Sequence, residues 1–162
     1  MIIYVKNKNT LIIDEFQLKC AIGKNGLNSK KIEGDYTTPK GLFNLTKLYF
    51  RKDRVGSVNC KIKKKVITKN MAWCNDPKHK KYNQEFDIST KKHSEKFYRK
   101  DNKYDYLITI SHNNKNIPNK GSAIFIHLTN DYKPTAGCIT LKRKDFEILL
   151  KLINHNTKIK IS

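Results

Sequence analysis

The stretch GSAIFIHLTNDYKPTAGCITL, residues 121–141, decides how the rest of the chain is interpreted. Its apolar run from Ala123 to Leu128 contains one polar residue, His127, and predicts a short buried strand that would hold the imidazole rigidly near its end. A polar loop follows, and Cys138 stands directly after Gly137. The stretch therefore places a histidine on a strand and a cysteine on a turn.

This combination of residue types suits nucleophilic catalysis. A cysteine attacks a carbonyl carbon as the thiolate, and a free thiol with a pKa of about 8.5 needs a nearby imidazole to take its proton. Cys138 is the candidate nucleophile, and His127 is the candidate base. Gly137 lets the backbone turn sharply, which predicts an exposed sulfur. With Thr135 and Ala136, it also predicts a turn whose amides face a developing oxyanion.

A purely structural interpretation of the same two residues is also open. Free cysteines are among the most buried residue types, and a histidine beside an apolar run is often a hydrogen-bonded core residue. One cysteine with a histidine elsewhere in the chain is only a candidate pair. Spacing alone does not decide between the two interpretations.

The stretch resembles the signature of YkuD-type L,D-transpeptidases, in which a histidine on a strand precedes a Ser/Thr-x-Gly-Cys motif. His127 and the run Thr135-Ala136-Gly137-Cys138 match that signature position by position. Upstream, residues 33–41, EGDYTTPKG, are similar to the GDGxTPxG turn of the family. Shorter similarities to one proteobacterial-type subgroup lie at Asp76-Pro77, Tyr82-Asn83, Ser94-Glu95 and His112-Asn113.

The resemblance covers most of the chain and implies both a fold and an activity. The implied fold is a β-rich mixed α/β domain over residues 1–162, a YkuD-like β-sandwich with one main amphipathic helix near the C-terminus. The implied activity is an L,D-transpeptidase that acts on peptidoglycan stem peptides through a thioester on Cys138, with His127 moving protons and no metal or organic cofactor. Site-shaping residues would be Thr135, Ala136 and Gly137, and substrate-binding residues would be His112, Tyr82, Asn83 and Arg143.

The chain departs from the family pattern at two positions. The family often has a second histidine where Ala136 stands, and an arginine or asparagine that helps to hold a substrate carboxylate where Thr140 stands. Lys142 or Arg143 could replace that carboxylate partner. The loop between His127 and Cys138 is also shorter than in many members. An L,D-carboxypeptidase that trims tetrapeptides with the same site is therefore a second hypothesis.

Charge raises a third hypothesis, from another class of protein. The formal net charge is +20, and such basic chains bind nucleic acid or other polyanions by releasing counterions. Only four of the 34 basic residues are arginines, however, and bidentate phosphate recognition favours arginine. We expect most of the lysines to be solvated and any nucleic-acid binding to lack sequence specificity. The length of 162 residues is enough for one domain with a real core.

Cysteine spacing argues against a metal site. Cys20, Cys60, Cys74 and Cys138 include no C-x-x-C pair, so we expect no zinc and four reduced thiols. The run His93-Ser94-Glu95 imitates half of a zinc deaminase motif, but the P-C-x-x-C half is missing.

The beginning of the chain bears on location. Residues 1–9 lack a basic region followed by a sustained apolar run, and no apolar run in the chain is long enough to span a membrane. As written, the sequence predicts a cytoplasmic protein. The resemblance implies the alternative of a periplasmic or wall-associated one, and the oligomeric state stays open.

Hydrophobic periodicity predicts the remaining elements. Alternating or β-branched runs predict an N-terminal hairpin and four further strands, at residues 2–5 with 10–13, and at 16–20, 42–49, 107–112 and 157–161. Phe146, Leu149, Leu150 and Ile153 recur at helical spacing and predict an amphipathic helix over Lys144 to Asn154. Ser94 is a possible N-cap for a helical turn to Tyr98, and residues 51–65 are expected to be a mobile solvated segment.

Overall fold

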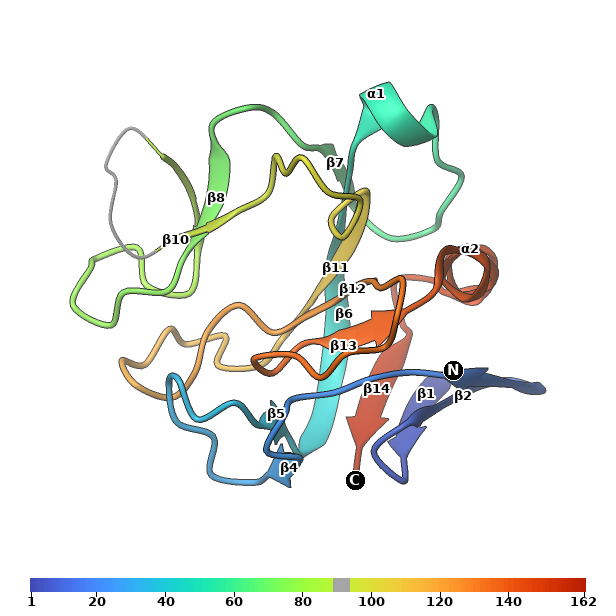
Figure 1. Ribbon diagram of the computed structural model, residues 1–162, viewed down its shortest axis with the longest axis horizontal. Helices are drawn as coiled ribbons and strands as arrows, with labels where there is room; N and C mark the ends of the chain where they lie inside the picture. Colours follow the sequence, from blue (N-terminus) through green and yellow to red (C-terminus); the bar gives the residue numbers. More distant parts are fainter. Residues whose placement is uncertain (89–93) are drawn as a thin grey trace.

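A computed structural model describes residues 1–88 and 94–162 of the chain. Within these ranges one large sheet crosses the molecule in the order β13-β12-β11-β6-β14-β1-β2-β3, and β7 pairs with β6 outside this path (Figure 1). In that order the strands are Ile139–Leu141, Phe125–Leu128, Tyr106–Ile110, Gly41–Phe50, Lys158–Ile161, Ile2–Lys6, Thr10–Ile13 and Phe16–Lys19, with Lys64–Val66 as β7.

Two smaller sheets and two helices complete the described part. The order β10-β8-β9 forms a three-stranded sheet, and β4 pairs with β5. These strands are Ser94–Lys96, Met71–Cys74, Glu85–Asp87, Leu27–Asn28 and Thr38–Pro39, in the order just given. The helices are α1, Lys52–Val55, and α2, Arg143–Leu152. The β-rich architecture with one main helix near the C-terminus confirms the predicted fold class.

The N-terminal hairpin forms as predicted, and its turn has a local cause. Asn7 and Lys8 have φ of 53° and 63°, and two successive positive φ values give the turn whose twist matches paired strands. The position of the last strand, by contrast, depends on strands that are far from it in the sequence. β14 lies between β1, to which it runs parallel, and β6, to which it runs antiparallel. The first and last strands of the chain are therefore neighbours inside the sheet, and because they run parallel, the two termini lie at opposite ends of this pair (Figure 1).

Two hydrophobic clusters lie on opposite faces of this sheet. Successive side chains of a strand point to opposite faces. Along β11, Ile108 therefore joins the larger cluster, which also takes in α2, while Leu107 joins a smaller aromatic one. The aromatic cluster contains Tyr49, Ile67, Met71, Phe97, Tyr104, Leu107 and Phe125, and the candidate site lies against it.

The predicted C-terminal helix is confirmed, with an N-terminus one residue earlier and a C-terminus two residues earlier than expected. Phe146, Leu149 and Leu150 are its buried residues and pack into the larger cluster. Burying three large apolar side chains contributes roughly 1.5–3 kcal/mol each before the cost of ordering the chain is subtracted. None of the helices in the described ranges is long and apolar enough to cross a membrane.

One local prediction is wrong, and another holds only in part. Ser94 does not begin a helical turn, because Ser94–Lys96 is a strand that pairs antiparallel with β8, with Glu95 opposite Trp73. The segment 51–65 is not a mobile solvated stretch throughout. It contains α1, and Arg51 is 4% exposed. In both places, partners far away in the sequence override the local pattern.

Candidate active site

His127 lies on the face of β12 that borders the aromatic cluster. Because side chains alternate along the strand, Ile126 and Leu128 enter the larger cluster, whereas Phe125 and His127 point the other way. The imidazole is 7% exposed and meets the ring of Tyr104 edge to face, with 5.0 Å between the centroids. The predicted buried strand therefore exists and holds the imidazole in a fixed orientation.

The contacts of the His127 ring define its tautomer. Nδ1 lies 2.9 Å from the carbonyl oxygen of Leu128, and because a carbonyl only accepts, Nδ1 carries the proton. Burial lowers the pKa of His127 to about 4, and the hydrogen bond to Leu128 opposes that shift in part. The ring is therefore neutral at pH 7, and Nε2 keeps a lone pair that can accept a proton.

The turn before Cys138 is held by two threonine hydroxyls. Thr135 Oγ1 accepts the amide of Gly137 at 3.0 Å and donates to the carbonyl of Cys138 at 2.6 Å. Thr38 Oγ1 donates to the carbonyl of Gly137 at 2.7 Å. Gly137 has a φ of 148°, and a Cβ there would lie 2.8 Å from the carbonyl oxygen of Thr37, so only glycine fits.

This geometry changes one expectation about the oxyanion site. The Gly137 amide, which the sequence placed beside a developing oxyanion, already donates to Thr135. Thr135 and Gly137 therefore shape the turn, and the Cys138 amide is the remaining predicted backbone donor. Ala136 is exposed and, with its two neighbours, forms part of the wall of the cavity described below.

The Cys138 sulfur rests between two backbone groups. The thiol donates to the carbonyl of Ala123 at 3.2 Å, and the amide of Phe125 donates to Sγ at 3.4 Å. Burial raises the pKa of Cys138 to about 12, although the Phe125 amide lowers it in part. The residue is only partly exposed, whereas the turn predicted an exposed sulfur, and its thiol is protonated at neutral pH.

Asn83 holds the residues that lead into strand β12. Among them is Ala123, whose carbonyl accepts the Cys138 thiol. Asn83 Oδ1 accepts the amide of Ala123 at 3.2 Å and the indole N–H of Trp73 at 3.0 Å, and its Nδ2 donates to the carbonyl of Asn113 at 2.9 Å. Ala123 has a φ of 54°, a left-handed value that a residue with a Cβ adopts only when its surroundings impose it. Strand β12 therefore begins at Phe125, two residues later than predicted.

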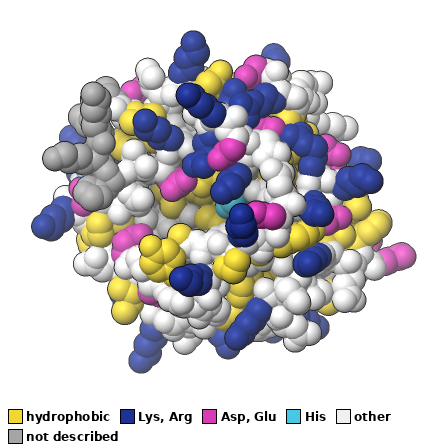
Figure 2. Space-filling model, in the orientation of Figure 1, with side chains coloured by type: hydrophobic (Ala, Val, Ile, Leu, Met, Phe, Trp, Pro, Cys, Tyr) yellow, Lys and Arg dark blue, Asp and Glu magenta, His cyan; other side chains and the backbone are white. Residues whose placement is uncertain are grey.

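A cavity of about 610 Å³ is lined by both Cys138 and His127, and the residues that line it are called its wall below. Four basic and three acidic side chains also line it, namely Lys31, Arg99, Lys103, Lys133, Glu33, Glu95 and Asp131. The charges inside the cavity are therefore nearly balanced, in contrast to the +20 of the whole chain. Figure 2 shows basic and acidic side chains side by side around the central hollow.

The structure does not bring the four predicted substrate-binding residues into this wall. Tyr82 is buried and donates to Glu33, and Asn83 is the buried support already described. The ring of His112 donates from Nε2 to the carbonyl of Lys120 at 3.0 Å. Arg143 is held by Asp105 at 2.6 Å. The contacts of these four residues support neighbouring loops. Binding of substrate by any of them stays a prediction.

Several residues of the wall were missed by sequence reasoning. Tyr36 lies in the turn that resembles the family pattern, so a signal for it existed. Arg99, Lys103 and Tyr104 come from a charged segment without a motif, and Thr140 was treated only as a missing arginine or asparagine. Thr140 is the register neighbour of His127 across β12 and β13 and is 1% exposed.

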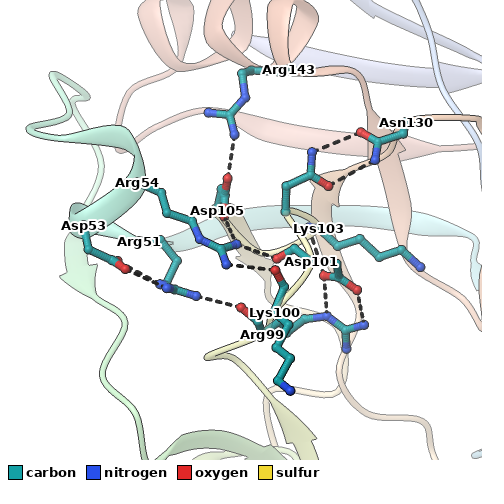
Figure 3. A network of polar contacts seen from close by, with 11 residues as sticks. Arg51, Asp53, Arg54, Arg99, Lys100, Asp101, Lys103, Asp105, Asn130 and Arg143 are labelled. Carbon is teal, nitrogen blue, oxygen red and sulfur yellow. Dashed lines mark hydrogen bonds and ion pairs between the residues drawn. The ribbon is translucent and has the colours of Figure 1, made fainter.

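The segment that supplies Arg99, Lys103 and Tyr104 is fastened by arginines (Figure 3). Arg51 donates to the carbonyl of Arg99 at 2.8 Å, and Arg54 donates to the carbonyl of Lys100 at 2.9 Å. Both Arg54 and Arg143 bind the buried carboxylate of Asp105. All four arginines of the chain belong to this network, as Figure 3 shows, so the arginines fix one wall of the cavity.

All four cysteines are free thiols. Among residues 1–88 and 94–162, no group of three His, Cys, Asp or Glu side chains could hold a metal ion. His93, part of the incomplete deaminase motif, lies outside the described residues.

Comparison with known proteins identifies the family of the chain. The catalytic-domain model of the L,D-transpeptidase family, YkuD, matches residues 1–161. The chain belongs to this family. Among solved structures, the fold is similar to the helical cell shape determining protein Pgp2 from Campylobacter jejuni, with a TM-score of 0.56 and 18% identity. The similarity covers 99% of this chain and 46% of that one, so this YkuD chain spans about half the length of Pgp2. No curated protein sequence matches the chain significantly.

The resting geometry of Cys138 predicts a steep pH dependence for its alkylation. Since the thiolate is the reactive form and the pKa is raised to about 12, the rate should rise roughly tenfold per pH unit between neutral pH and about pH 10. Iodoacetamide labelling followed by peptide mapping measures this rate, with the partly exposed Cys60 as internal reference. A rate for Cys138 that is flat over this range would show that the thiol is already ionised at neutral pH.

Proposed function

We propose that this YkuD domain is a cysteine-dependent L,D-transpeptidase that acts on peptidoglycan stem peptides through a thioester on Cys138. The observation that carries the proposal is the presence in one cavity wall of Cys138 and a neutral His127 whose Nδ1 proton is committed to Leu128. Family membership supports the reaction class. Without the shared cavity and the family membership, His127 would be interpreted as a core histidine and Cys138 as a buried structural thiol.

The proposed reaction has two acyl transfers. His127 Nε2 takes the proton of Cys138, and the sulfur attacks the carbonyl carbon at the L-centre of the diamino-acid residue. The tetrahedral intermediate collapses when the bond to the terminal D-amino acid breaks, and the departing amine takes the proton back from Nε2. An acceptor amine then attacks the thioester, gives a proton to Nε2, and forms the new amide as the Cys138 thiol is restored.

The resting hydrogen bonds add a requirement to the first step. The thiol donates to Ala123 rather than to His127, so the Cys138 side chain has to turn toward Nε2 before it loses its proton. Substrate that fills the cavity excludes water and strengthens the electrostatic interactions around the sulfur. Reaction of the thiol is thereby coupled to occupancy of the cavity.

The charges of the cavity favour a substrate that carries both signs. A stem peptide has free carboxylates and an amine, and the wall offers four basic and three acidic side chains. Lys142 and Arg143, the two expected substitutes for the missing carboxylate partner at Thr140, lie outside the wall. Arg99, Lys103 and Lys133 line it and are the better candidates to bind a carboxylate.

The deciding experiment is incubation with a disaccharide-tetrapeptide, with and without excess D-methionine, followed by mass spectrometry of the products. We expect the terminal residue to be exchanged for D-methionine, because a bound amine that is oriented beside the thioester outcompetes water. Tripeptide alone in both tubes would identify an L,D-carboxypeptidase that uses the same Cys138 and His127. Neither product, with Cys138 intact and reactive, would show that the substrate assignment is wrong.

The control for this assay is Cys138→Ala, which removes the sulfur and leaves the threonine contacts of the turn in place. It should form no product of either kind. Product formation by this variant would assign the activity to another residue or to a contaminant.

A further inference from the structure

At rest, the pair described so far places no positive charge beside the Cys138 sulfur. In many cysteine sites a protonated imidazole offsets the negative sulfur. Here burial lowers the pKa of His127 to about 4, so this ring is neutral before it accepts the proton of Cys138. An anion inside a largely buried site is costly unless a fixed cation lies close to it. A buried cation in the wall of the cavity would supply that charge.

Lys31 is the basic residue of the wall that is most deeply buried. Its side chain is 4% exposed, whereas Arg99 is 31% exposed and Lys133 is 84% exposed. Its Nζ donates to Asp35 Oδ1 at 2.6 Å and to the carbonyl of Ile32 at 3.4 Å. An ammonium has three N–H donors. These two acceptors, the ones found in the described part of the chain, therefore leave one donor for the cavity that Lys31 lines.

Gly121 makes room for this side chain, and Gly137 lies in contact with its end. A Cβ on Gly121 would lie 2.9 Å from Lys31 Cγ and 3.1 Å from Lys31 Cε. A Cβ on Gly137 would lie 3.5 Å from Lys31 Nζ. Both glycines have positive φ, 89° and 148°, so the backbone at each also disfavours a side chain. The lysine passes beside Gly121, and its ammonium lies next to Gly137, the residue that precedes Cys138.

Asp35 anchors the ammonium and is itself firmly held. Its carboxylate accepts the amides of Ile32 and Thr37 at 2.9 Å each and the hydroxyl of Thr37 at 2.8 Å, in addition to Lys31. Burial opposes ionisation of Asp35, but these hydrogen bonds outweigh it and hold its pKa well below the usual range. Asp35 therefore stays ionised at neutral and mildly acidic pH, and the position of the Lys31 charge is set by the turn of residues 32–37.

We propose that Lys31 is an electrostatic positioning residue of the active site, whose fixed ammonium stabilises the thiolate of Cys138 and the oxyanion formed when that sulfur attacks a carbonyl. The part of the proposal that concerns the oxyanion rests on the proposed function. The part that concerns the thiolate does not. It assigns a role to a residue outside the signature of histidine, glycine and cysteine. Lys31 acts on Cys138 through the field of its charge.

The other groups that face Cys138 do not replace this charge. Glu95 of β10 raises the pKa of Cys138 while Lys31 lowers it, so the two charges act in opposite directions. Tyr104, which precedes β11, is a neutral phenol whose pKa burial raises well above its ordinary value. His127 of β12 is neutral at pH 7. Arg99 is shared between Asp101 and Glu95.

Alkylation of Cys138 tests the proposal without peptidoglycan. Lys31→Met should raise the pKa of this thiol, and Glu95→Gln should lower it. An opposite charge a few ångströms away shifts a pKa by about 1–3 units, and part of the lost thiolate is offset because a more basic thiolate is more nucleophilic. We therefore expect Lys31→Met to slow iodoacetamide labelling of Cys138 by roughly 3- to 30-fold at fixed pH. Glu95→Gln should accelerate it, and Cys60 should not change.

Two further variants separate the charge from the ion pair. Lys31→Arg keeps a cation and should restore most of the labelling rate. Asp35→Asn breaks the same ion pair but keeps the ammonium, so it should not slow labelling as Lys31→Met does. Equal slowing in Lys31→Met and Asp35→Asn would show that the pair only maintains the fold, and an unchanged rate in Lys31→Met would overturn the proposal outright. Thermal unfolding checks each variant, and Lys31→Gln replaces Lys31→Met if the latter does not fold.

Discussion

Replacing His127 by alanine should lower the rate of Cys138 acylation by roughly 10²–10⁴-fold, the usual range for loss of a general acid and base. The reason is specific to one nitrogen. Nδ1 is committed to the carbonyl of Leu128, so Nε2 is the group that can take the proton of Cys138 and return it to the departing amine. Intact-protein mass spectrometry of the acyl-enzyme, sampled over time with tetrapeptide, measures the rate. Added imidazole should restore part of it, because the space left by the ring borders the cavity.

His112→Ala is the matched control. Its ring lies outside the cavity wall and holds the carbonyl of Lys120, so acylation should change far less. If His112→Ala were the severe variant and His127→Ala nearly silent, the assigned base would be the wrong histidine. The wild-type enzyme adds a second check through pH. Because the pKa of His127 is lowered to about 4, its basic form persists in mild acid, and the acidic limb should fall near pH 4 rather than near pH 6.5.

Phe97→Ala should destabilise the fold by about 3–5 kcal/mol, the range measured when a buried phenylalanine is truncated. Phe97 is 0% exposed and lies at the centre of the aromatic cluster. Its ring meets those of Tyr49, Phe125 and Tyr104 edge to face at 5.0, 5.6 and 6.0 Å, and it stacks on Trp73 at 6.2 Å. Truncation leaves a cavity that these rings cannot all move to fill.

Urea unfolding of the variant and of a control measures this effect. Phe16→Ala is suitable as the control, because Phe16 is 42% exposed on the edge strand β3 and should cost no more than about 0.5 kcal/mol. Similar losses for the two variants would mean that the aromatic cluster does not carry the stability assigned to it. Phe125 and Tyr104 also border the site, so Phe97→Ala should reduce Cys138 acylation more than its stability loss alone explains.

The sequence predicted correctly those features that depend on neighbours along the chain. The spacing of Phe146, Leu149 and Leu150 specified α2, because a helix joins residues three and four apart. The hairpin of β1 and β2 followed from β-branched runs and a turn. The run from Ala123 to Leu128 and the motif at Cys138 located the candidate pair, because chemistry of this kind needs particular residue types on a rigid strand and a sharp turn.

Tertiary structure alone decided which distant residues surround that pair. Ser94–Lys96 is a strand because β8 offers it backbone partners. Strand β14 completes the sheet between β1 and β6, which lie more than 100 residues earlier in the sequence. Lys31 belongs to no motif, and its place next to Gly137, the residue before Cys138, depends on the missing side chain of Gly121. Local periodicity holds no information on such contacts, since they form only when the sheet brings separate loops to one edge. The sequence by itself therefore determined the candidate reacting groups, whereas the fold determined the charges, hydrogen bonds and burial that set their protonation.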